Sequence, residues 1–502
     1  MGAADMLVLA LTHPLEFRTL INFWIWHEPK RDITSQKEYA TSGWDRPSMR
    51  KCWEFLDLTS RSFSAVIKEL EGDLARTVCL FYLVLRGLDT IEDDMTLSDE
   101  VKQPLLRNFD VHTVTPGWNF DGSGPNESDR QLLVEYENVV TELLLLDAGY
   151  REVILDICRK MAAGMATYAH KAALVAEGKA TSPEDLFVAD GAAFDLYCHH
   201  VAGVVGEGLS RLLAISGKEA AHLGGELELS NAMGLMLQKT NIMRDYREDV
   251  DQQRYFWPRT FWTAHGFSHQ GDLRTDGPND GEARTRAMWV LSEMVLDALR
   301  HAEDCLDYLS LLRNQSVFNF CAIPQTMAMA TLSVCFMNGA VFERNVKIRK
   351  AAAVELIMRS TNPRDVAYMF RDYARVIHAK AVPSDPSYIK ICVACAKVEM
   401  WAEHHFPSFI HISSEGGQIR TNFDASDARA KVLQAERLRG EKRIRDTRAL
   451  AGDARNPGPG VEESGGPPIL FLLAIMGMAL LIFGGTAAAL YYLASNGWLG
   501  EA

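Results

Sequence analysis

The sequence predicts an all-α protein, a single large helical bundle with a central cavity. Apolar residues recur at helical spacing over long stretches, whereas the alternating pattern of a β-strand is hard to find. Two acidic clusters interrupt otherwise apolar helices, and such clusters need a polar cavity inside the bundle. The stretches with helical spacing are 52–71, 76–94, 132–146, 151–177, 197–215, 231–249, 287–313, 324–338 and 363–379.

Composition narrows the class of protein. The chain has 502 residues with 47% hydrophobic and 24% charged residues, which is typical of a globular protein. Its net charge of −14 argues against a nucleic-acid partner. Its nine cysteines lack the spacing of a disulfide framework, so we expect reduced thiols in a domain that faces the cytosol.

The C-terminal part of the chain predicts a membrane anchor. Residues 469–494 contain no charged residue and are long enough to cross a bilayer as a helix. Because six basic residues lie upstream between Arg437 and Arg448, and only Glu501 is charged downstream, we expect the main domain on the cytosolic side. We therefore divide the chain into an N-terminal segment (1–40), a helical main domain (41–410), a basic and Pro/Gly-rich linker (411–468), a transmembrane anchor (469–494) and a short tail (495–502).

The two acidic clusters, 89–94 and 245–249, have the same spacing. Residues four apart on a helix share a face with Cβ atoms roughly 6 Å apart, so Asp89 and Asp93 project together, as do Asp245 and Asp249. Mg²⁺ is usually held by one or two carboxylates together with substrate phosphates. The pair of clusters predicts a site for Mg²⁺ and a diphosphate, and the alternative for either cluster alone is a solvated acidic helix face.

Polar residues near the first cluster fit the same chemistry. Ser60, Arg61 and Ser62 offer two hydroxyl groups and one guanidinium, which suits bidentate contact with a phosphate. Tyr82 and Arg86 precede Asp89 at helical spacing and share its face.

Near the second cluster, Gln238 and Asn241 lie seven and four residues before Asp245, where their amide oxygens would reach a hydrated metal. Arg254 follows the cluster, and we expect it to close over a diphosphate. The basic patch 346–350 is interpreted either as a phosphate site or as an ordinary solvated turn.

These stretches resemble the squalene and phytoene synthase family, and within it the squalene synthases. The resemblance covers roughly residues 40–400, and the C-terminal anchor also matches this branch. It implies the isoprenoid synthase type of helical bundle. The matching segments are SRSF at Ser60, YLVLRGLDTIEDD ending at Asp94, YCHHVAGVVGEGLSRL from Tyr197, QKTNIMRDYRED from Gln238, RYFWP from Arg254 and LRNQSVFNFCAIPQ from Leu312.

The resemblance also implies an activity with Mg²⁺ and NADPH as cofactors. Two farnesyl diphosphates would condense head to head to presqualene diphosphate, which would then rearrange reductively to squalene, a step of sterol biosynthesis. We expect a monomer, tail-anchored in the endoplasmic reticulum membrane. Two alternatives stay open, a phytoene- or dehydrosqualene-type synthase that skips the hydride and a non-catalytic membrane-anchored scaffold.

Site roles follow from positions within the matching motifs. The implied catalytic residues are Tyr197, a proposed acid/base, together with Tyr82, Phe318 and Phe320, of which the two phenylalanines would line an apolar cavity. Whether the base is Tyr197 or the released diphosphate is left open, because a free phenol has a pKa near 10. The implied metal ligands are Asp89, Glu92, Asp93, Gln238, Asn241, Asp245 and Asp249; the diphosphate contacts are Ser60, Arg61, Ser62, Arg86, Arg244 and Arg254; and the cofactor contacts are Lys347 and Arg349.

Two charged residues have no implied role. Arg247 replaces an apolar residue of the relatives, and we expect it to point away from the metal face. Glu207 is expected to pair with an arginine that the sequence does not identify.

Overall fold

The computed structural model describes residues 9–26, 31–60, 62–176, 179, 188–274, 281–408, 411–412, 419–420 and 438. The chain divides into two compact units, Met1–Ala451 and Gly452–Ala502. The predicted anchor and tail, and almost all of the predicted linker, lie outside the described residues.

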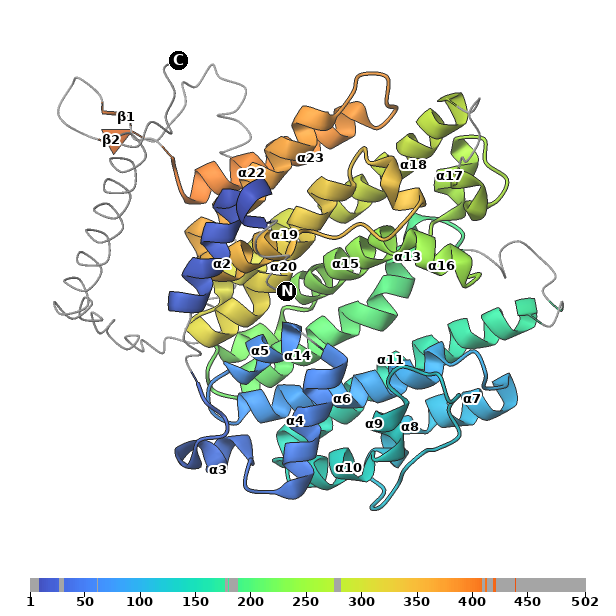
Figure 1. Cartoon of the computed structure of the whole chain (residues 1–502), viewed down its shortest axis with the longest axis vertical. Helices are drawn as coiled ribbons and strands as arrows, with labels where there is room; N and C mark the ends of the chain where they lie inside the picture. The colour runs from blue at the N-terminus through green and yellow to red at the C-terminus, as the bar shows by residue number, and fades with distance from the viewer. Residues whose placement is uncertain are drawn as a thin grey trace, which may run out of the picture. The chain divides into compact units, whose positions relative to one another are not determined.

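The predicted all-α architecture is confirmed (Figure 1). The strands of the described residues are two short ones, β1 (His411–Ile412) and β2 (Ile419–Arg420), which pair antiparallel. The longer helices are α2 (Pro14–Trp26), α4 (Pro47–Ser60), α6 (Leu74–Asp93), α7 (Asp99–Arg107), α11 (Ala148–Ala176), α14 (Val204–Ile215), α15 (Leu227–Arg244), α18 (Gly281–Leu299), α19 (Ala302–Leu311), α20 (Gln315–Cys335), α21 (Lys350–Arg359), α22 (Pro363–Lys380) and α23 (Tyr388–His405). Short helices connect them: η1 (Gln36–Glu38), α3 (Tyr39–Ser42), α5 (Ser62–Lys68), α8 (Phe109–His112), α9 (Arg130–Val134), α10 (Glu137–Leu144), α13 (Gly191–Cys198), η2 (His199–Gly203), η3 (Ala221–Gly225), α16 (Tyr246–Asp251), α17 (Arg259–Ala264), η4 (Gln270–Leu273) and η5 (Gly339–Phe342).

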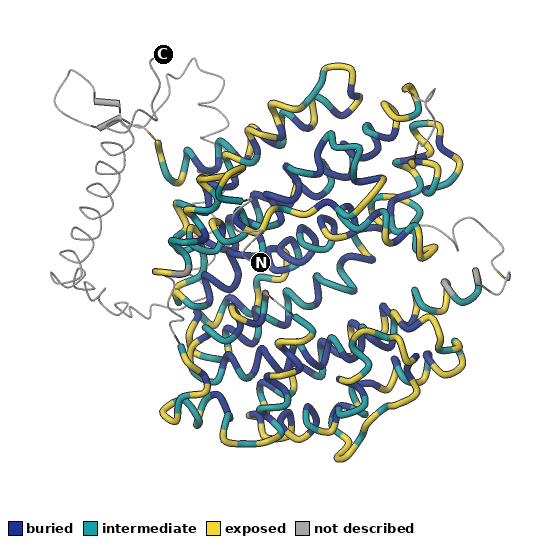
Figure 2. Tube along the Cα trace, viewed as in Figure 1, coloured by how far each residue is buried: buried dark blue, intermediate teal, exposed yellow. Residues whose placement is uncertain are grey.

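The core is built around α15 and α20. Helix α15 packs against α14, α18, α19 and α20, and Figure 2 shows buried residues along these central helices. Helix α20 is long and apolar enough to cross a membrane, but most of its residues are buried, so it is a core helix of the bundle. Asn314 caps its first turn by accepting from the N–H groups of Ser316 and Val317.

Several predicted helices are interrupted in the structure. The stretch 197–215 contains a π-helical turn, η2, and the stretch 287–313 breaks between α18 and α19. The turn η2 lies close against α15, since a Cβ atom at Gly203 would come within 2.0 Å of Asn231 Oδ1. The stretch 231–249 breaks at Asp245, which separates α15 from α16.

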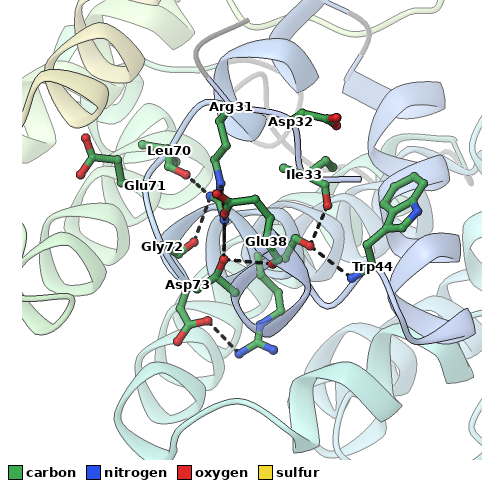
Figure 3. A network of polar contacts seen from close by, with 12 residues as sticks. Arg31, Asp32, Ile33, Glu38, Trp44, Leu70, Glu71, Gly72 and Asp73 are labelled. Carbon is green, nitrogen blue, oxygen red and sulfur yellow. Dashed lines mark hydrogen bonds and ion pairs between the residues drawn. The ribbon is translucent and has the colours of Figure 1, made fainter. Parts of the chain in front are cut away.

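Arg31 connects the N-terminal segment to the turn that precedes α6. Its Nε donates to Glu38 at 3.0 Å, its Nη2 to Thr41 at 2.7 Å, and its Nη1 to the carbonyl groups of Gly72, at 3.0 Å, and of Leu70 (Figure 3). Because the Arg31 side chain is only 8% exposed, these bonds are shielded from water. They hold the start of the helix that carries the first acidic cluster.

Candidate active site

The first acidic cluster lies at the C-terminal end of α6. The apolar residues of this helix are buried, which fixes its rotation in the bundle. Carboxylates at a helix C-terminus face the negative end of the helix dipole, so they need positive partners. Arg86 supplies one: its Nη1 donates to Asp89 at 2.6 Å, and its Nε lies 3.3 Å from Asp129.

The second acidic cluster spans the break between α15 and α16. Arg244 holds both oxygens of Asp245, with Nε donating at 2.8 Å and Nη2 at 2.5 Å. Asn345 also donates its side-chain amide to Asp245. Asp249 lies one turn further on and is buried, with 6% of its surface exposed.

Arg254 connects the two clusters. Its Nη1 donates to Asp93 Oδ1 at 2.8 Å, and its Nη2 lies 3.1 Å from Asp249 Oδ1. Asp93 and Asp249, far apart in the chain, therefore face one another across a single guanidinium.

Both clusters line one cavity of about 820 Å³. A volume of this size is sufficient for a ligand with a long apolar chain. Of the predicted site residues, those that line it are Asp89, Glu92, Asp93, Tyr197, Gln238, Asn241, Asp245, Asp249 and Arg254.

Carboxylates outnumber cations among the residues that line the cavity. Burial, with the neighbouring Asp93 carboxylate, raises the pKa of Asp89 to about 6 despite the opposing effect of Arg86. Burial raises the pKa of Asp249 to about 7, with Asp245 and Asp93 adding to the shift against the effect of Arg254. The pKa of Glu92 is also well above its usual value because the side chain is buried beside Asp93 and Asp89. A bound cation would relieve this repulsion.

These residues fit a magnesium site that a ligand completes. The carboxylate and amide oxygens are the hard donors that Mg²⁺ prefers. Within the described part of the chain, no three His, Cys, Asp or Glu side chains converge closely enough to hold a metal by themselves. Mg²⁺ in proteins commonly keeps several waters and shares its coordination with oxygens of a bound ligand.

Tyr197 forms part of an aromatic wall of the cavity. Its ring stacks on Phe256, with centroids 5.0 Å apart, and meets Tyr168 edge-on at 4.8 Å. Burial and the nearby Glu92 carboxylate raise the pKa of Tyr197 well above its usual value. The phenol thus keeps its proton at neutral pH.

Comparison with known proteins identifies the family. The sequence model of the squalene/phytoene synthase family matches residues 56–352, more than half of the chain. The chain belongs to this family. The squalene synthase of Ganoderma lucidum is 58% identical over 89% of this chain and 95% of its own, and that of Schizosaccharomyces pombe is 47% identical over 78% of this chain and 81% of its own. The solved structure of TcSQS with a bound ligand has a TM-score of 0.65 and 37% identity, covering 72% of this chain and 99% of that one.

Other predicted residues of this synthase lie away from the cavity. Phe318 and Phe320 are buried on α20, where Phe320 packs against Phe63 with ring centroids 5.4 Å apart. Lys347 and Arg349 are exposed. Arg349 is engaged by α2, with its Nη2 at 2.6 Å from Glu16 and its Nη1 at 3.0 Å from His13.

The predicted diphosphate contacts near α4 are only partly described. The Ser60 hydroxyl donates to the Leu56 carbonyl at 2.6 Å. Arg61 and the side chain of Ser62 lie outside the described residues. The Tyr82 ring lies next to Arg86, with the guanidinium carbon 6.0 Å from the ring centroid.

The structure adds residues that sequence reasoning missed. Lys102 is buried and donates to the Glu92 carbonyl at 2.8 Å, which places a cation behind the first cluster. Tyr168 and Phe256 face Tyr197. Phe256 could have been predicted as a site residue, because it belongs to the matched RYFWP segment. Asp129 and Asn345 lie in no sequence pattern that indicates a contact with the clusters.

The two charged residues without an implied role have partners. Arg247 donates to Asp251 at 2.9 and 2.6 Å and does not line the cavity. Glu207 accepts from Lys160 at 2.6 Å and from Arg211 at 3.0 Å, which connects α14 with α11.

Proposed function

We propose that this protein is a squalene synthase. It condenses two farnesyl diphosphates head to head to presqualene diphosphate and converts that intermediate to squalene with NADPH. The observation that carries the proposal is the bridge from Asp93 through Arg254 to Asp249, because it joins both acidic clusters in one cavity. The squalene synthase relatives support the choice of reaction.

The carboxylates of the two clusters bind the diphosphate through Mg²⁺. Asp89, Glu92, Asp93, Asp245 and Asp249 would hold the ions, and the amide oxygens of Gln238 and Asn241 line the same cavity. Mg²⁺ supplies positive charge that stabilises the departing diphosphate.

Of the arginines at the clusters, Arg254 binds the same leaving group. Arg254 exchanges its hydrogen bond to Asp93 and its ion pair with Asp249 for contacts with diphosphate oxygens, since a guanidinium suits either partner. Arg86 and Arg244 stay with Asp89 and Asp245 and keep these side chains oriented.

Tyr197 acts with its proton in place. Because its pKa is raised by burial and by Glu92, the phenol is a hydrogen-bond donor and a poor base. The released diphosphate is the alternative base for the proton that is lost when the cyclopropane ring closes. The rings of Tyr197, Phe256 and Tyr168 present aromatic faces that stabilise a carbocation.

The reductive half-reaction uses the basic patch 346–350. NADPH supplies the hydride that ends the rearrangement. Lys347 is exposed and can contact a phosphate of the cofactor directly. Arg349 is paired with Glu16 and must leave this partner before it binds the phosphate. Phe318 and Phe320, which do not line the cavity, support it from the buried core of α20.

The apolar segment 469–494 anchors the protein in the endoplasmic reticulum membrane, with the helical domain in the cytosol. A water-insoluble product fits release at a membrane. The enzyme acts as a monomer.

Product analysis tests the proposal. The detergent-solubilised full-length protein is incubated with farnesyl diphosphate and Mg²⁺, with and without NADPH, and the products are identified by mass spectrometry. Squalene that forms only with NADPH, and presqualene diphosphate that accumulates without it, are the expected results. A dehydrosqualene or phytoene-type product that is indifferent to NADPH would overturn the reductive assignment, and no coupling at all would leave diphosphate binding alone.

A further inference from the structure

A fully buried lysine lies behind the wall of the cavity. Lys239 lies on α15 between the cavity-lining residues Gln238 and Asn241, and its side chain is 0% exposed. Its Nζ lies 2.5 Å from Asp195 Oδ1 and 2.5 Å from Asp297 Oδ2. A buried ammonium is tolerated only when it is paired and hydrogen-bonded, so these contacts hold Lys239 in one position.

Arg300 completes a balanced network around Lys239. Its Nη2 donates to both oxygens of Asp195 at 2.5 Å, and its Nε donates to Asp297 Oδ1 at 3.0 Å. The neighbouring His301 is buried and adds no charge, because burial together with the Lys239 and Arg300 charges lowers its pKa to about 3. Two cations therefore face two carboxylates contributed by α13 and α18.

The network acts on the helix that carries Tyr197. Asp195 and Tyr197 are two residues apart on α13, so their side chains project to nearly opposite sides of the helix. On one side of α13, Asp195 is paired with Lys239. The Lys239 Nζ also lies 5.3 Å from the ring centroid of Phe194 on the same helix. The other side presents Tyr197 to Phe256 and Tyr168 in the cavity.

We propose that Lys239 is a positioning residue for the first half-reaction. It joins α13, which carries Tyr197, to α15, which carries the amide and carboxylate donors of the second cluster. This arrangement fixes the distance between the phenol and the diphosphate site, and displacement of a positioned group by about 1 Å costs roughly 100-fold in rate. The inference rests on the role of Tyr197 in the proposed function.

Lys239→Met tests the proposal, with Lys160→Met as its matched control. Lys160 also contacts two carboxylates, Glu207 at 2.6 Å and Asp156 at 3.1 Å, but it is 41% exposed and does not line the cavity. Full-length enzymes are assayed for presqualene diphosphate without NADPH. We expect Lys239→Met to lower kcat by about 30-fold with the KM for farnesyl diphosphate within about threefold, and Lys160→Met to change neither by more than about twofold.

A double variant separates positioning from general loss of structure. If Lys239 acts through the Tyr197 side chain, Tyr197→Ala combined with Lys239→Met loses no more activity than Tyr197→Ala alone. Losses that multiply, or a Lys239→Met enzyme that behaves like Lys160→Met, would overturn the proposal.

Should Lys239→Met fail to fold, Asp195→Asn decides the question, since it keeps the shape of the side chain on α13 but removes the charge that pairs with Lys239. It should lower kcat by about fivefold with unchanged KM, and an unchanged kcat would overturn the proposal. A wild-type enzyme that forms no presqualene diphosphate would instead overturn the proposed function, which is a separate outcome.

Discussion

Asp89 and Asp93 lie on one uninterrupted helix, α6, whereas Asp245 lies at the break between α15 and α16 and Asp249 lies on the short helix that follows. The partners differ as well. Asp89 pairs with Arg86 on its own helix, but Asp245 also depends on Asn345, 100 residues away in sequence. The two clusters have the same spacing, but their carboxylates are held in different ways. A continuous helix positions the first cluster, whereas tertiary contacts around a helix end position the second.

Arg254→Met should break the link between the clusters and have the largest effect. The guanidinium bridges Asp93 and Asp249 and is proposed to bind the diphosphate, so its loss removes a charge-assisted hydrogen bond and an ion pair. We expect kcat/KM for presqualene diphosphate formation to fall by about 100- to 1000-fold. Arg247→Met is the control, because Arg247 pairs with Asp251 outside the cavity. A fall of less than about fivefold would mean that the bridge has no role in catalysis.

The Mg²⁺ requirement should depend on pH through the second cluster. Asp249, with a pKa of about 7, is mostly protonated at pH 6 and must lose that proton to bind a cation. The Mg²⁺ concentration for half-maximal rate should therefore rise by about tenfold from pH 8 to pH 6. Asp251→Asn is the control and should show the same change in Mg²⁺ requirement with pH. A wild-type Mg²⁺ requirement that is the same at pH 6 and pH 8 would contradict the raised pKa of Asp249.

In the metal-free protein, the same two carboxyl groups should make the free energy of unfolding fall as the pH rises. Their folded-state pKa values, about 6 for Asp89 and about 7 for Asp249, lie above those of an unfolded chain. Their contribution to the free energy of unfolding is therefore fully present below pH ~4 and is lost as the pH rises through 6 and 7. In Asp249→Asn, the fall in Tm between pH 5.5 and 8 should be smaller than in the wild type by about 2 °C, as measured by differential scanning calorimetry. An identical fall would contradict this assignment.

Asn345→Ala should weaken the second cluster selectively. The amide holds Asp245, and one hydrogen bond to a charged group is worth about 1.5 kcal/mol. We expect kcat/KM to fall by about fivefold to tenfold, with a higher Mg²⁺ requirement. Asn108→Ala is the control, since Asn108 donates to the Pro104 carbonyl in an exposed position. Equal behaviour of the two variants would show that Asp245 does not need this support.

Glu16→Gln should have the smallest effect and concerns the second half-reaction. It removes the ion pair with Arg349, although the contact of Arg349 with His13 stays, and an ion pair with one exposed partner is worth at most about 1 kcal/mol. The KM for NADPH, measured from presqualene diphosphate to squalene, should fall by about twofold to threefold. Arg18→Gln, an exposed position on the same helix, should leave it unchanged. A higher KM would show that α2 assists cofactor binding.

The contrast between the clusters also explains what the sequence revealed. Helical periodicity predicted the bundle, and the spacing of Asp89 and Asp93 was sufficient because local geometry alone brings them together. The break at Asp245 was missed, since the apolar pattern runs through it and the interruption depends on packing around the helix end. Contacts such as Asn345 with Asp245 and Arg86 with Asp129 join distant segments, and no local pattern encodes them. The roles of Lys347 and Arg349 came from resemblance, and they stay predictions.

The central claim, that both clusters hold one diphosphate, is tested most directly by a binding cycle. Calorimetry measures the Kd of farnesyl thiodiphosphate, a substrate analogue that resists ionisation, with saturating Mg²⁺ for the wild type, Asp93→Asn, Asp249→Asn and the double variant. The account predicts that each single variant weakens binding by at least about tenfold and that the double variant weakens it by no more than about threefold further. A single variant that leaves the Kd unchanged would show that its cluster does not hold the diphosphate and would contradict the account.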